Sequence, residues 1–115
     1  MYYRNWWHTL RPRARPAASD PIGGLDVSIL HGQLLEPVLK IGDIRTDKRI
    51  DFVGGIRGPQ ALAALVDSGA AAVAFAMYPV SVEDLMRIAD TGGIMPPKST
   101  WFEPKLRDGL LIHEI

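Results

Sequence analysis

Apolar residues recur at helical spacing in three segments of this chain. They lie between residues 25 and 36, between 58 and 69, and between 81 and 92. A repeat of three and four residues places such side chains on one face of a helix. Pro59 suits the first turn of the second segment, and Ser81 can cap the third. The pattern therefore predicts three helices.

Other apolar segments are typical of strands. Residues 50–53 are closed by glycines, and residues 71–78 are nearly all apolar, which fits a strand buried on both faces. With the helix between them they form a strand–helix–strand unit, which favours a parallel pair. Thr100–Phe102 and Leu110–Ile112 indicate two final strands. We therefore predict an α/β or α+β fold: a small mixed sheet, about three helices and one parallel strand–helix–strand unit.

The N-terminal part of the chain differs from the rest. Met1–Leu10 is aromatic and partly alternating, which predicts a strand or hairpin that turns near Arg4–Asn5. Residues 11–19 carry prolines among arginines and alanines, as an extended linker does. We therefore divide the chain in two. Residues 1–19 form an aromatic strand or hairpin with an Arg/Pro-rich linker, and residues 20–115 form a single α/β domain.

Composition narrows the classes of protein that remain. The chain has 115 residues, no net charge and no cysteine, which excludes disulfides and thiolate sites. No apolar run reaches the length of a membrane span, so we expect no membrane contact and a cytoplasmic location. Residues 1–19 hold four arginines and no acid, but we prefer a solvated loop there to a nucleic-acid contact. Residues 43–49 alternate in charge and predict a solvated surface connection.

The strongest candidate for chemistry is a proline-rich run near the end of the chain. Residues 95–106 contain three prolines, two aromatic residues, two hydroxyl residues and Lys98. Because prolines fix the backbone, Lys98, Ser99 and Thr100 could be held ready to bind an anion, such as a phosphate-bearing small molecule. The alternative is a shaped connection into a final strand.

Four further residues are weaker candidates for ligand binding. His31 lies on the first predicted helix, with Asp26 five residues before it and Glu36 five residues after. This spacing does not stack the three side chains, and a histidine here is more often hydrogen-bonded than a general base. Arg57, in the glycine-rich turn of residues 54–58, could help to bind an anion. The three histidines lack the spacing of a ligand pair, so we expect no metal and no cofactor.

The proline-rich run also resembles one family. The run is Met95-Pro96-Pro97-Lys98-Ser99-Thr100-Trp101-Phe102-Glu103-Pro104-Lys105-Leu106, and the supporting pieces are Leu25 to His31, Leu34 to Pro37, Ile50 to Gly55, and Ala74-Phe75. Together they resemble the C-terminal part of the bacterial and archaeal domain-of-unknown-function family numbered 1015, over roughly residues 20 to 115.

The resemblance carries expectations about function. That family resembles the ParB/sulfiredoxin-like group, which includes kinases that phosphorylate free serine. Its members are much longer, and their Asp-Gly-His-His-Arg type loop lies upstream of the region that matches here. The resemblance therefore implies a non-catalytic C-terminal portion of a kinase-related protein. Its partner would be the upstream half of such a protein or a second copy of the chain.

Two alternatives to this interpretation stay open. One is a small homo-oligomeric interaction module, and the other is a complete small enzyme that binds a phosphate-bearing ligand. A portion without its other half would expose apolar surface, which promotes association. We expect the aromatic hairpin and the first helix to be the contact elements.

Overall fold

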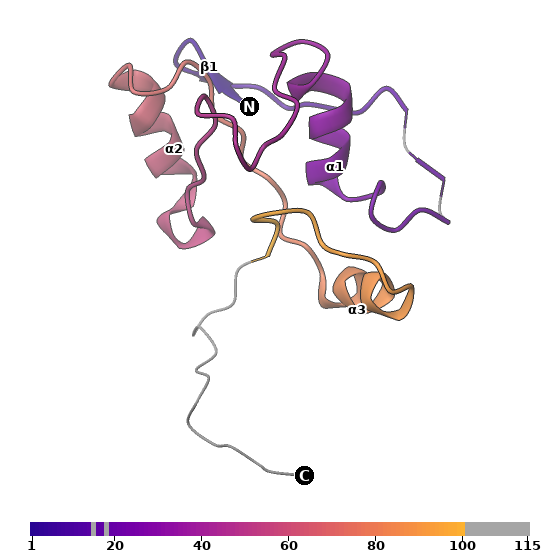
Figure 1. Ribbon diagram of the computed structural model, residues 1–115. Coiled ribbons are helices and arrows are strands. Elements are labelled where there is room, and N and C mark those ends of the chain that lie inside the picture. The colour runs from indigo at the N-terminus through magenta and orange to yellow at the C-terminus, as the bar shows by residue number, and fades with distance from the viewer. Residues whose placement is uncertain (15, 18, 101–115) are drawn as a thin grey trace.

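The computed structural model describes residues 1–14, 16–17 and 19–100 of this chain. They form a small mixed α/β fold with a two-stranded antiparallel sheet and three α-helices, as the sequence predicts (Figure 1). In chain order the elements are β1 (Tyr2–Tyr3), β2 (Trp6–Trp7), α1 (Asp26–Leu30), the π-helical turn η1 (His31–Leu35), the 3₁₀ turn η2 (Gly55–Arg57), α2 (Gly58–Asp67) and α3 (Val82–Asp90).

The predicted aromatic hairpin is confirmed. Strands β1 and β2 are antiparallel, with Tyr2 opposite Trp7 and their ring centroids 5.0 Å apart. Arg4 and Asn5 form the turn, with φ values of 49° and 64°. Positive φ at both central residues gives the turn whose twist matches that of the strands.

Tyr2 joins the hairpin to two other parts of the chain. Its backbone N–H donates to the carbonyl oxygen of Ala74 at 2.7 Å, and the Ala74 N–H donates back at 3.1 Å. Its hydroxyl donates to the Asp67 carboxylate, at the end of α2, at 2.9 Å. Tyr2 and Ala74 are both buried. One aromatic residue thus connects β1, α2 and the segment after α2.

Helices α2 and α3 end where the local sequence predicts. Pro59 lies in the first turn of α2, and Gly69 follows the helix with a φ of 77°, a conformation that glycine adopts without strain. The Ser81 hydroxyl accepts the Asp84 N–H at the start of α3, and Gly92 follows its end with a φ of 68°. Caps and stops of this kind are local, so the sequence is enough to locate them.

The first helix is short and continues as a π-helical turn. A regular helix begins at Asp26, after a turn in which the Asp20 carboxylate accepts the Gly23 N–H at 2.8 Å. Leu25 and Leu35, at the two ends of α1 and η1, are buried. These two leucines anchor the helix that carries His31.

The predicted parallel strand–helix–strand unit is not confirmed. Residues 50–53 contain no strand, and within residues 71–78 only Ala74 forms a bridge, which is antiparallel and pairs with Tyr2. The predicted burial of this segment on both faces is wrong, because Tyr78 is 84% exposed. The two predicted C-terminal strands lie outside the described residues, apart from the first residue of one.

Helix α3 stands apart from the other elements. Within residues 1–14, 16–17 and 19–100 it has no close contact with another helix or strand, and Figure 1 shows it separated from α1 and α2 by irregular segments. Ile88 on its inner face is buried, close to Ile22 and Gly93. Among the described helices, none is long and apolar enough to cross a bilayer.

Candidate functional site

A groove lies between the first helix, the loop that follows it and the proline-rich run. Its volume is about 520 Å³, and its polar lining comes from Ser28, His31, Asp43 and Arg45, beside Pro96 and Pro97. The fold thus brings His31 next to the start of the proline-rich run. These two regions are more than sixty residues apart in the sequence. Each of them was proposed separately, from the sequence, as a candidate for ligand binding.

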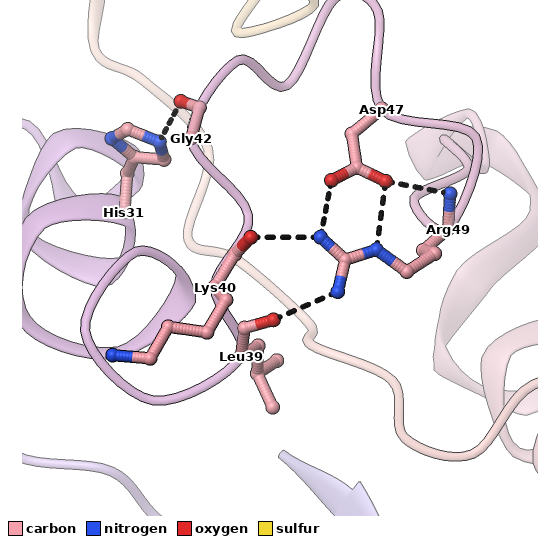
Figure 2. A network of polar contacts seen from close by, with 6 residues as sticks. All are labelled: His31, Leu39, Lys40, Gly42, Asp47 and Arg49. Carbon is pink, nitrogen blue, oxygen red and sulfur yellow. Dashed lines mark hydrogen bonds and ion pairs between the residues drawn. The ribbon is translucent and has the colours of Figure 1, made fainter.

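His31 is half-buried and hydrogen-bonded to the backbone (Figure 2). Its Nε2 lies 2.8 Å from the carbonyl oxygen of Gly42. Because a carbonyl oxygen only accepts, Nε2 donates, and Nδ1 of the neutral ring is left as an acceptor. The bond ties η1 to the loop after it. This is the hydrogen-bonded arrangement that is commoner for such a histidine than a general base.

Asp43 and Arg45 form an ion pair at the edge of the groove. The Arg45 guanidinium donates to both carboxylate oxygens of Asp43, at 3.1 and 3.2 Å. The side chains are 44% and 69% exposed, so the pair is solvated and weak. Hydrogen bonds from Arg45 lower the pKa of Asp43. An anion that entered the groove would have to compete with Asp43 for this guanidinium.

Asp47 and Arg49 form a second pair, which reaches further into the fold (Figure 2). The guanidinium of Arg49 also donates to the carbonyl oxygens of Leu39 at 3.1 Å and Lys40 at 2.7 Å. These carbonyls follow η1, where Lys40 turns the chain with a φ of 57°. Hydrogen bonds from Arg49 lower the pKa of Asp47 to about 2. Arg49 therefore closes the loop that carries Gly42 to His31.

The prediction that residues 43–49 are merely solvated charges is incomplete, although most of them are exposed. A repeated Asp-x-Arg spacing marks both ion pairs. In each case Oδ1 of the aspartate accepts the backbone N–H of the arginine two residues later, at 2.9 Å. This local turn directs the arginine side chain back onto the same carboxylate. The spacing was the sequence signal for this feature.

The proline-rich run turns at Pro97 and Lys98. The Ser99 hydroxyl donates to the carbonyl oxygen of Pro96 at 2.6 Å, and the Ser99 N–H donates to the same oxygen at 3.3 Å. Lys98 is exposed with a φ of 58°, and Thr100 is exposed as well. The Ser99 hydroxyl is therefore engaged with the backbone of its own turn.

The other candidates do not gather around His31. Asp26, Glu36 and Arg57 are exposed, and none of them lines the groove. Asp26 lies in the first turn of α1, and Arg57 ends η2. Over the described part of the chain, no cluster of three or more histidines and carboxylates could bind a metal ion.

No family model, curated protein or solved structure matches this chain. The resemblance to the domain-of-unknown-function family numbered 1015 stays a prediction that rests on the quoted residues. A function can be inferred from the chemistry of the groove and from the side chains that the fold leaves exposed.

Proposed function

We propose that this chain is a non-catalytic interaction portion of a protein of the family that its proline-rich run resembles, a family that is itself similar to free-serine kinases. It binds another polypeptide through exposed apolar side chains. The observation that carries the proposal is the number of large apolar side chains that face solvent. Among the residues that the structure describes, the most exposed are Trp6 at 72%, Ile56 at 73%, Tyr78 at 84% and Ile94 at 86%.

The aromatic hairpin is one such exposed surface. Trp6 is 72% exposed, and Trp7 and Tyr3 beside it are 45% and 40% exposed. Burying one large apolar side chain contributes about 1.5–3 kcal/mol, and tryptophan and tyrosine are enriched among residues that dominate binding energy. The tight turn sets the backbone that carries these rings, and the Trp7 ring lies 5.0 Å from the Tyr2 ring. The hairpin is therefore well suited to contact another polypeptide.

The polar groups of the groove also favour binding over catalysis. Arg45 is paired with Asp43, and the His31 Nε2 donates to Gly42. Beside the groove, the Ser99 hydroxyl donates to Pro96. Arg45 and Ser99 would each have to give up a bond before acting on a substrate. His31 keeps Nδ1 as an acceptor, but its bond to Gly42 holds the loop against η1. This arrangement supports a structural role for the groove.

The non-catalytic part of the proposal is tested with the chemistry that the resemblance implies. The full chain is incubated with serine and either ATP or ADP, and phosphoserine is measured by mass spectrometry. We expect no phosphoserine above a protein-free blank. Turnover that is lost in Lys98→Ala but kept in Lys48→Ala, another exposed lysine, would replace this proposal with the small-enzyme alternative.

A further inference from the structure

Helix α3 carries apolar side chains on two sides. Ile88 is 1% exposed and lies close to Ile22 and Gly93. Val82 and Met86 are one helical turn apart and are 66% and 60% exposed. At 3.6 residues per turn they lie on the side of the helix away from Ile88. Within the described part of the chain, α3 thus presents an apolar stripe to solvent.

The isolated position of α3 gives this stripe a physical consequence. The helix has nine residues and no close contact with another described helix or strand. Helices of this length are marginal in water without tertiary packing. The Ser81 cap stabilises its first turn and Ile88 packs on the inner side. A partner on the outer stripe would add packing on the side that the described residues leave exposed.

The charges beside the stripe suit a second copy of this chain as the partner. Glu83 and Arg87 each follow a stripe residue by one position, so they flank the stripe on the same side. In an antiparallel, two-fold arrangement of two α3 helices, Val82 of one copy meets Met86 of the other. The same arrangement brings Glu83 of one copy to Arg87 of the other. Symmetry makes each of these contacts twice.

We propose that α3 is the element through which two copies of this chain associate, antiparallel and with the stripe of Val82 and Met86 at the centre. This inference rests on the proposed interaction function and names the partner as a second copy. Arg87 lies 3.7 Å from Asp84 of its own helix and is 61% exposed. The ion pair between Arg87 and Asp84 is therefore weak and solvated. In the dimer, Arg87 bonds to Glu83 of the second copy in place of Asp84 or in addition to it.

The expected dimer is weak and depends on concentration. A standard interface buries roughly 800 Å² on each partner, and a stripe of two apolar positions on a short helix supplies less. The mass of the full chain, followed by sedimentation equilibrium, should rise from 12.7 kDa towards twice that value as concentration increases.

Met86→Glu tests the stripe. It should raise the dissociation constant at least about tenfold, which is what the loss of one buried apolar side chain amounts to. The matched control is Val38→Glu, which places the same charge at an apolar residue that is 67% exposed and lies outside α3. Circular dichroism confirms that both variants fold. A wild-type monomer at every concentration, no effect of Met86→Glu, or an equal effect of Val38→Glu would overturn the inference.

Charge reversal tests the antiparallel arrangement. In the Glu83→Arg variant, two positive charges face each other across the dimer, which should weaken association. The double variant Glu83→Arg with Arg87→Glu restores opposite charges and should restore association. A double variant that stays as weak as the single one would contradict this arrangement. A monomer that forms no phosphoserine overturns self-association alone, whereas phosphoserine formation overturns the proposed function.

Discussion

At the scale of single residues, Tyr2 holds three segments together, and its hydroxyl can be tested separately from its ring. Tyr2→Phe removes the bond to Asp67 and keeps the ring that packs on Trp7. We expect the free energy of unfolding to fall by about 0.5–1.5 kcal/mol, measured by urea denaturation. Tyr3→Phe on the exposed side of the same strand is the control, and an equal loss in both variants would contradict this role for Tyr2.

Asp47 should give the fold a specific sensitivity to acid. Arg49 lowers the pKa of Asp47 to about 2 in the folded chain, whereas an unfolded aspartate has a pKa of about 3.9. Between these values the unfolded state binds more protons, so this contribution to stability is lost as the pH falls from about 4 to about 2.

The matched variant for this pH dependence is Asp47→Asn. Its urea midpoint should lie below that of the wild type at neutral pH, and the difference should shrink as the pH falls through this window. Asp90→Asn, an exposed carboxylate at the end of α3, serves as the control. A difference between Asp47→Asn and wild type that is constant from neutral pH to pH 2 would show that the carboxylate of Asp47 carries no such linkage.

At the scale of elements, α3 depends on its N-cap. Ser81→Ala removes the acceptor of the Asp84 N–H, which costs about 1 kcal/mol at such positions. Because α3 has no neighbouring helix or strand among the described residues, we expect a visible loss of helical signal in circular dichroism. Ser68→Ala, whose hydroxyl donates at the end of α2, should change the signal less. The reverse order would mean that α3 is stabilised by packing.

Substitutions of Lys98 distinguish an architectural role of the proline-rich run from an anion-binding role. Lys98 has a φ of 58°, which a residue with a side chain adopts at a cost of about 1 kcal/mol. Lys98→Gly should therefore be more stable to urea than Lys98→Ala, and phosphate should affect neither more than it affects the wild type. Stabilisation of the wild type by phosphate that both variants lose would favour an anion site.

The helices could be predicted because their signals are local. Pro59, Gly69 and Ser81 determine the ends of α2 and α3 by the conformation or bond of one residue. Strands need a partner that the local sequence does not specify. Residues 50–53 are apolar enough for a strand but lie beside no other strand, and Ala74 pairs with Tyr2 at the opposite end of the chain.

The site was predicted only in part, because the local sequence does not specify which distant segments meet. His31 and the proline-rich run were candidates from their residue types, but their meeting in one groove depends on the loop between them. That loop is closed by Arg49 on the carbonyl oxygens of Leu39 and Lys40. Backbone acceptors have no sequence signature. Only the Asp-x-Arg spacing could have indicated this arrangement, and the prediction of a solvated connection did not use it.

At the scale of the whole molecule, the proposed association depends on apolar side chains that the fold leaves in solvent. The predicted contact elements were the hairpin and the first helix. The hairpin is exposed at Trp6, whereas the leucines at the ends of the first helix, Leu25 and Leu35, are buried. The exposed side chains therefore favour α3 over the first helix as the second contact element, because Met86 of α3 is 60% exposed.

Hydroxyl-radical footprinting of the dilute full chain tests this exposure most directly. Oxidation of each side chain is followed by mass spectrometry and corrected for the intrinsic reactivity of its residue type. We expect Trp6, Tyr78 and Met86 to react rapidly, while Tyr2, which is 7% exposed, is protected. Protection of Trp6, Tyr78 and Met86 to the level of Tyr2 in the dilute monomer would contradict the proposed interaction function, because the chain would then cover its own apolar surface.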